Sequence, residues 1–214
     1  YFKRMEASHG GSGPEFRGTD GPLHITRGTR SNPLFDAFIE AGRQAGFETT
    51  EDYNGAKQEG VGPMEETVWE GRRWSGAHAY LRPALHRPNL EVAQGALTTR
   101  VLLEGRRAVG IEIRRGAETR KVFADREVIL CGGAVNTPQL LQLSGLGGAA
   151  LLEGLGIAVV ADLPGVGSNL QDHLEVYVQF ANKLPVSIDP GMSWVRRLGV
   201  GAQWLLQRKG IGAT

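Results

Sequence analysis

The chain has 214 residues, and its 24 lysine and arginine residues against 23 aspartate and glutamate residues leave a formal net charge of +1. This balance does not indicate a polyanionic partner, so we expect no nucleic acid. Cys131 is the single cysteine, which excludes an internal disulfide, and we interpret it as a buried, reduced thiol. The five histidines lack metal-ligand spacing, so we expect no metal. No apolar run approaches the roughly 20 residues of a membrane span.

Residues 1–88 are predicted to form a loop-rich and helical segment. Within it, residues 1–30 are polar and glycine-rich with little periodicity, and we expect a loop there. Asn32 stands where a helix N-cap belongs, and Pro33 stands at the first helical position. Apolar residues follow at helical spacing, and Gly46 is expected to end this helix.

A second helix and a small β-meander are expected next. Ser75 is a suitable capping residue for a helix that extends through Leu85. From residue 89 onward, the apolar residues alternate as they do in strands. The predicted strands cover residues 90–92, 101–103, 109–113 and, more weakly, 120–123.

One later segment is the most informative part of the sequence. The apolar run Val128–Cys131 is typical of a strand that a sheet buries on both faces, and Gly132 and Gly133 permit a sharp turn or a close approach to a ligand. Thr137 is then predicted to cap a helix that begins at Pro138. A strand, a glycine turn and a helix N-terminus together form a place where a nucleotide can bind, although an ordinary strand–helix connection has the same pattern.

The remaining segments are short. Gly145 is expected to end the preceding helix. The elements predicted after it are a helix at 149–155, a strand at 157–160, a tight turn at 163–167, a strand at 175–180 and a final helix that includes Trp194. Pairs of glycines recur along the chain, but none continues to a third glycine at the spacing of a dinucleotide fingerprint.

Two groups of polar residues each have two interpretations. Asp172 could orient the imidazole of His173, or it could fix a loop by a hydrogen bond to the backbone. Glu175 begins an alternating strand, Tyr177 lies on the same face, and Trp194 follows after a short loop. A carboxylate with aromatic neighbours suits a quaternary ammonium, which offers no hydrogen bonds. The alternative is a solvated strand residue beside a core tryptophan.

Residues 133–147 match, without a break, the second signature of the glucose–methanol–choline (GMC) flavin oxidoreductases. The chain as a whole resembles this family, because several separate motifs occur in order and at sensible spacing. These further motifs are residues 21–23, 52–55, 58–60, 71–75, 79–85, 87–90 and 169–173.

The resemblance implies a mixed α/β fold. It predicts part of a doubly wound FAD-binding domain with a small β-meander, followed by the start of a substrate-binding domain with an antiparallel sheet. Residues 89–172 would then supply the FAD-domain strands, the meander and the second signature, and residues 173–214 would begin the substrate-binding domain.

The resemblance also implies a chemistry. Choline would be oxidised to betaine aldehyde, in glycine betaine synthesis, by hydride transfer to the flavin of FAD. The contacts with FAD are assigned to Val101, through its backbone, and to Gly132, Gly133 and Ala134. The implied electron acceptor is the membrane quinone pool, and the implied location is the bacterial cytoplasm with peripheral attachment to the inner membrane.

For the substrate, the resemblance places Glu175 opposite the trimethylammonium group of choline, Trp194 in an aromatic cage and His173 near the active site. The family's dinucleotide fingerprint and catalytic histidine would fall before and after this sequence. We therefore expect an internal fragment that holds no catalytic residue, is inactive alone and needs the missing N- and C-terminal parts. Another alcohol-oxidising member of the family and a noncatalytic remnant are the alternatives.

Overall fold

The chain forms two compact units, which are described separately. The first contains residues 1–91 and 179–214, and the second contains residues 92–178. The computed structural model describes residues 1–11, 13–181, 183–184, 186, 193–210 and 213.

The first unit carries short strands and several helices. Strand β1 pairs with β2 in parallel, β2 pairs with β3 antiparallel, and β4 and β5 form a hairpin. Its elements are α1 (Phe2–Met5), β1 (Glu6–Ser8), β2 (Leu23–Arg27), α2 (Pro33–Gln44), β3 (Glu65–Glu66), β4 (Val68–Trp69), β5 (Arg72–Arg73), the π-helix η1 (Ala77–Leu81), α3 (Arg82–Ala84) and α6 (Trp194–Gln207). The prediction of a loop over residues 1–30 is therefore wrong for residues 2–8 and 23–27, because α1, β1 and β2 are too short to show a periodic pattern.

Helix α2 follows the prediction closely. The side chain of Asn32 accepts a hydrogen bond of 2.9 Å from the Leu34 N–H, and Pro33 opens the helix. Gly46 has a φ of +88°, which an L-residue adopts only with strain, and the helix ends just before it. These are the capping and stop signals that the sequence contains.

The second predicted helix forms with a different start. Ser75 gives no side-chain cap; its Oγ lies 3.3 Å from Nδ1 of His78, and Gly76 occupies the N-cap position of η1. The first turns have π-helical hydrogen bonding, and α3 continues directly from them. Because Leu90 and Val92 have no strand partner, the strand predicted at 90–92 is absent from the described part of the chain.

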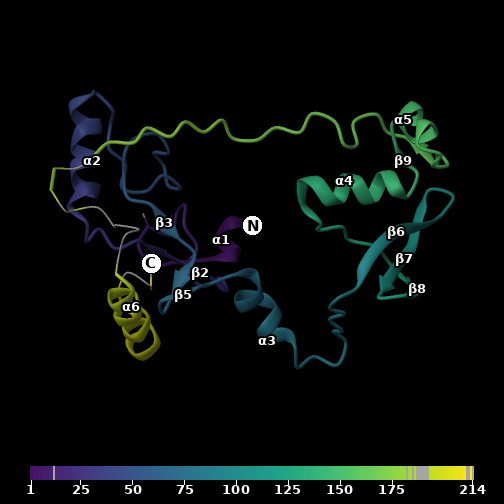
Figure 1. Cartoon of the computed structure of the whole chain (residues 1–214), viewed down its shortest axis with the longest axis horizontal. Coiled ribbons are helices and arrows are strands. Elements are labelled where there is room, and N and C mark those ends of the chain that lie inside the picture. Colours follow the sequence, from purple (N-terminus) through teal and green to yellow (C-terminus); the bar gives the residue numbers. More distant parts are fainter. Residues whose placement is uncertain (12, 182, 185, 187–192, 211–212, 214) are drawn as a thin grey trace. The chain divides into compact units, whose positions relative to one another are not determined.

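The second unit is built around a three-stranded antiparallel meander in the order β6-β7-β8. Helix α4 lies beside the sheet and contacts β6 (Figure 1). The elements of this unit are β6 (Leu97–Glu104), β7 (Arg107–Arg115), β8 (Glu118–Phe123), α4 (Gly133–Leu143), β9 (Leu146–Gly147), α5 (Ala149–Gly154) and β10 (Ala161–Asp162). The predicted meander is confirmed, and its third strand is longer than expected because six of its residues pair with β7.

The informative segment departs from its prediction at both ends. The run Val128–Cys131 forms no strand, because no neighbouring strand in the described residues offers it a ladder, and Cys131 is exposed rather than buried. Helix α4 begins at Gly133, four residues before Thr137, so Pro138 lies inside the helix. The hydroxyl of Thr137 still accepts a backbone N–H, that of Gly132 at 3.0 Å.

The later elements are confirmed in part. Helix α5 and the turn at 163–167 form as expected. The strand predicted at 157–160 does not form, because β10, which pairs with β9 in parallel, begins only at Ala161. Residues 175–180 are extended but form no ladder, so the strand predicted there is wrong for the described chain. A strand needs a partner for its backbone groups, and alternation alone does not supply one.

The buried core is small. The fully buried side chain of Leu152 anchors α5, and Val101 and Ile113 are buried in the meander. Among the helices that the structure describes, none combines the length and the apolar character needed to cross a membrane.

Candidate functional site

The N-terminus of α4 is formed by two glycines. Gly133 has a φ of +81°, and a Cβ on Gly132 would lie 3.2 Å from Asn136 Cβ and from the backbone nitrogen of Thr137. No side chain caps the helix, and its first turn carries no acidic residue. The first N–H groups of α4, which include that of Ala134, are therefore oriented toward whatever lies in front of the helix.

A cavity of about 520 Å³ lies against the edge of β6. Five consecutive residues of β6, Arg100–Glu104, form one wall. The opposite wall comes from the end of α4 and from the segment before β10, and it consists of Leu143, Ser144, Gly145, Ile157, Ala158 and Val160. Because consecutive residues of a strand alternate between its two faces, this cavity lies along the edge of β6, where backbone groups are accessible.

Val101 lies in the middle of this edge. It is paired with Ile111 of β7, but its N–H points away from β7 and donates a hydrogen bond of 2.8 Å to Ser144 Oγ. In a strand, the N–H and the C=O of one residue point to the same side, so the carbonyl of Val101 also faces the outer edge. The backbone donor of Val101 is thus already used, and its carbonyl is directed to the side of the cavity.

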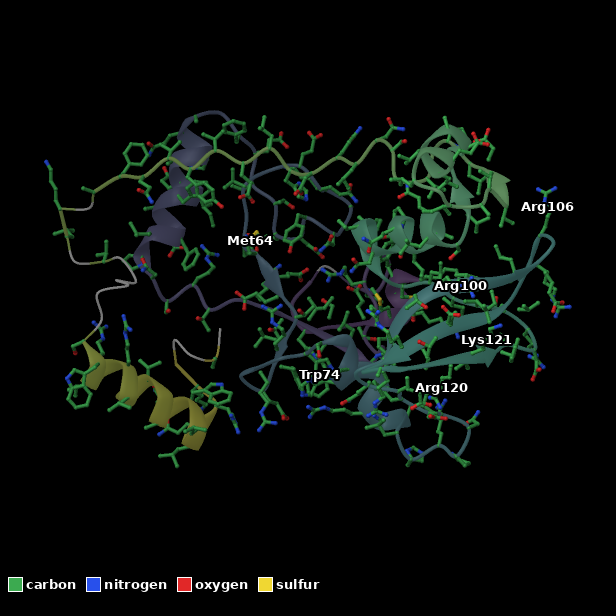
Figure 2. All side chains as sticks on the ribbon, turned by 45° about the vertical axis from the view of Figure 1, so that its right-hand side comes forward. Met64, Trp74, Arg100, Arg106, Arg120 and Lys121 are labelled. Atoms are coloured by element: carbon green, nitrogen blue, oxygen red, sulfur yellow. The ribbon has the colours of Figure 1, made fainter. Side chains whose placement is uncertain are left out.

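Charged side chains of the β6–β8 meander lie at the cavity. Arg100 binds Glu112 at 3.0 Å, and the Thr99 hydroxyl donates to the same carboxylate at 2.9 Å. The hydrogen bond from Thr99, with that from Arg100, lowers the pKa of Glu112. Arg100 and Lys121 both extend from the meander and contribute to the cavity lining (Figure 2).

Asp172 and His173 make a backbone contact. Asp172 Oδ1 accepts a hydrogen bond of 2.8 Å from the backbone N–H of His173. This contact agrees with the second interpretation, a hydrogen bond that fixes the loop, because the imidazole of His173 takes no part in it.

Glu175 and Tyr177 form a pair. The phenol of Tyr177 donates a hydrogen bond of 2.6 Å to Glu175 Oε2, and both side chains are exposed. Trp194, the first residue of α6, is also exposed and belongs to the other compact unit. The juxtaposition of Glu175 with Trp194 therefore stays a prediction.

The first unit contains a buried ionic cluster that the sequence analysis missed. Arg17 is 3% exposed and binds three carboxylates, those of Glu6, Asp52 and Glu65, at 3.0, 2.8 and 3.0 Å. The hydrogen bond with Glu6 is the largest cause that raises the pKa of Arg17. Burial alone would raise the pKa of Glu6, but hydrogen bonds from Arg17 and the Gly18 N–H outweigh it and lower this pKa. Residues separated by up to 59 positions meet here, and no local pattern reveals such a meeting.

Aromatic rings stack beside this cluster. Trp69 lies 4.1 Å from His9 and 4.4 Å from His24, measured between ring centroids, and His9 Nε2 is 2.8 Å from His24 Nδ1. Burial and the neighbouring His9 lower the pKa of His24. The described residues include no group of three histidine, cysteine, aspartate or glutamate side chains placed to hold a metal ion.

A family model described as GMC oxidoreductase matches residues 1–175. The chain belongs to the GMC oxidoreductase family. The family that the motifs at 133–147 indicated is therefore confirmed, and so is the mixed α/β fold class.

The chain is similar to curated GMC proteins over its whole length. It is 57% identical over all 214 residues to an oxygen-dependent choline dehydrogenase of Sinorhizobium medicae, of which it covers 39%. The chain thus spans about two fifths of the length of this relative.

Solved structures have the same fold. A FAD-dependent oxidoreductase from Chaetomium thermophilum matches the whole chain with a TM-score of 0.87 and 27% identity, over 40% of its own length. A pyridoxine 4-oxidase from Mesorbium loti matches 76% of the chain with a TM-score of 0.71 and 33% identity, over 32% of its own length.

Proposed function

We propose that the chain is the central part of a FAD-dependent alcohol dehydrogenase that oxidises choline to betaine aldehyde in the synthesis of glycine betaine. The observation that carries this proposal is the identity of 57% to an oxygen-dependent choline dehydrogenase across all 214 residues. Since the chain covers 39% of that relative, the activity is proposed for the whole protein.

The residues of the second unit fit the cofactor. When bound, FAD accepts a hydride from the alcohol carbon. The glycine turn at Gly132 and Gly133 leaves room for a close backbone approach, and the N–H groups around Ala134 suit an anionic or polar part of the cofactor. The carbonyl of Val101 faces the cavity edge and can accept a hydrogen bond from adenine.

Glu175 is proposed to bind the trimethylammonium group of choline. A quaternary ammonium offers no N–H donor, so a carboxylate and aromatic faces are the groups that attract it. Tyr177 orients the carboxylate through its hydrogen bond of 2.6 Å. Trp194 is proposed to supply an aromatic face and His173 to lie near the reacting hydroxyl, both on the strength of the resemblance.

The test is an anaerobic titration of the full-length protein with choline while the flavin absorbance is followed. A decrease in the absorbance of oxidised flavin on addition of choline supports both the proposed cofactor and the proposed substrate. The control is 3,3-dimethylbutan-1-ol, which has the shape of choline without its charge and should reduce the flavin far more weakly. If the protein binds flavin but choline does not reduce it, choline is not the substrate, and the assignment to the GMC family is unaffected.

The electron acceptor needs its own measurement. We propose the membrane quinone pool as acceptor, and a cytoplasmic enzyme held peripherally at the inner membrane. The curated relative named above is called oxygen-dependent, so dioxygen is the competing acceptor. Choline-dependent reduction of a soluble quinone analogue under argon supports the quinone, and turnover that occurs only with dioxygen refutes it.

A second candidate is the oxidation of another alcohol. The chain is 33% identical to a pyridoxine 4-oxidase, whose name gives an alcohol other than choline as its substrate. This likeness favours the second candidate. The same titration with pyridoxine distinguishes the two. Residues 1–214 expressed alone are expected to be inactive, and dye reduction with choline by this piece would contradict that expectation.

A further inference from the structure

Helix α6 is attached to the β4–β5 hairpin near its C-terminal end. The indole Nε1–H of Trp204 donates a hydrogen bond of 2.6 Å to the Gly71 carbonyl, across 133 positions of the sequence. The guanidinium of Arg208 lies 4.2 Å from the centroid of the same indole. The hairpin and the helix belong to one compact unit, so this contact is part of the internal geometry of that unit (Figure 1).

The hairpin loop and the helix end fit closely at this contact. Glu70 and Gly71, with φ values of +51° and +65°, form the two-residue loop between β4 and β5. A Cβ on Gly71 would overlap the Arg208 carbonyl oxygen, so glycine allows the helix end to come this close. Arg208 has a φ of +55°, and its N–H donates to the Trp204 carbonyl at 2.9 Å, so the helix ends at the contact.

Trp194 lies at the opposite end of the same helix. It is the first residue of α6, directly after the N-cap Ser193, and it is 72% exposed. The distance from Trp194 to Trp204 is about 15 Å along the helix axis. Because a hydrogen-bonded helix carries a displacement from one end to the other, the attachment at Trp204 determines where the ring of Trp194 is held.

We propose that Trp204 is a positioning residue for the substrate: its attachment to Gly71 places the ring of Trp194 where a quaternary ammonium binds. This inference rests on the proposed function, in which Trp194 supplies an aromatic face to choline. The attraction between a cation and a ring requires the cation to lie over the ring face, within about 6 Å of its centroid. A helix that can shift would therefore weaken the site even though Trp194 itself is unchanged.

The test uses Trp204→Phe in the full-length protein, which removes the indole N–H and keeps an aromatic ring. The KM for choline should rise about fivefold, the effect of one lost hydrogen bond. The kcat should change by less than about twofold, because the ring of Trp194 binds the ammonium equally before and during the reaction. The kcat/KM for the neutral 3,3-dimethylbutan-1-ol should also change by less than about twofold, since this alcohol carries no charge for the ring to attract.

A second tryptophan provides the matched control. Trp74 lies in the same compact unit, and its Nε1–H also donates to a backbone carbonyl, that of Pro22 at 2.9 Å. Trp74→Phe removes the same kind of hydrogen bond without touching α6, so the KM for choline should stay unchanged. If Trp204→Phe does not fold, Arg208→Lys, which keeps the charge but loses the planar group over the indole, should raise the KM for choline about twofold.

A double-mutant cycle separates positioning from general stability. Trp194→Leu should raise the KM for choline about tenfold, and adding Trp204→Phe should raise it no further. If Trp204→Phe has its full effect in the Trp194→Leu protein, or weakens the use of both alcohols equally, Trp204 only supports the fold and the inference is overturned. An unchanged KM for choline in Trp204→Phe also overturns it. A wild-type protein whose flavin choline does not reduce refutes the proposed function itself.

Discussion

The phenol of Tyr177 donates a hydrogen bond of 2.6 Å to the carboxylate of Glu175. This bond raises the pKa of Tyr177, because the protonated phenol donates it and ionising the phenol would lose it. One residue separates the two, so both side chains extend from the same side of the extended chain. The carboxylate is thus oriented by its own segment of the chain.

Glu175→Gln in the full-length protein should raise the KM for choline by about thirtyfold, which corresponds to about 2 kcal/mol of lost attraction to the quaternary ammonium. Tyr177→Phe, which keeps the carboxylate and an aromatic ring, should raise it only a few-fold. Steady-state kinetics with choline provide the measurement. An unchanged KM in Glu175→Gln would remove Glu175 from the substrate site.

Arg17→Met should strongly destabilise the protein. The substitution leaves Glu6, Asp52 and Glu65 without their shared cation, and breaking a buried ion pair by removing one partner costs about 3–5 kcal/mol. Thermal unfolding of the full-length protein should show a large fall in Tm.

The matched control is Arg43→Met. Arg43 pairs with Glu40 one helical turn away at 2.8 Å, and both side chains are largely exposed. Solvent screens an exposed pair of this kind, so its loss should change the Tm little. Equal losses of Tm in the two variants would contradict a special role for the Arg17 cluster.

His24 should make stability depend on pH. Its pKa is lowered in the folded state by burial and by His9, partly opposed by Glu70, so the unfolded chain binds a proton more readily. The stabilisation is therefore complete above the ordinary pKa of 6.5 and is lost as the pH falls through the lower folded pKa. Tm measured against pH should fall in this window, and His24→Gln should flatten the profile relative to the exposed control His86→Gln.

Gly145→Ala should destabilise the second unit by about 1–3 kcal/mol, because alanine must adopt a positive φ at this position and its Cβ would meet the Ala158 carbonyl. Gly154→Ala is the control, since a Cβ there meets no atom within 4 Å and Gly154 lies in α5. Chemical denaturation should show loss for the first variant and no loss for the second. Equal midpoints would show that the turn after α4 relaxes freely.

Local signals explain which elements were predictable. The cap at Asn32, the stop at Gly46 and the alternation in the meander act within a few residues, and the structure reproduces them. The strands predicted at 128–131 and 175–180 depend on partners that no local pattern contains, and they do not form in the described chain.

The candidate site shows the same division. The glycine turn at 132 and 133 was predictable from the sequence, because Gly133 has a positive φ of +81°, a conformation that favours glycine. The hydrogen bond between Val101 and Ser144 joins positions 43 residues apart, so the local sequence around either residue does not predict it. One usable signal existed: Ser144 is a polar residue at the end of an apolar helix face, directly before a glycine.

Pro138 lies inside α4 and changes the backbone hydrogen bonding at the start of that helix. Proline has no N–H, so it cannot donate to the carbonyl four residues earlier, which is that of Ala134. The first turn of α4 therefore lacks one of the backbone hydrogen bonds that an unbroken α-helix forms there. Because helix carbonyls point away from the N-terminus, the start of α4 presents backbone N–H donors, and these are the groups from which an anion accepts.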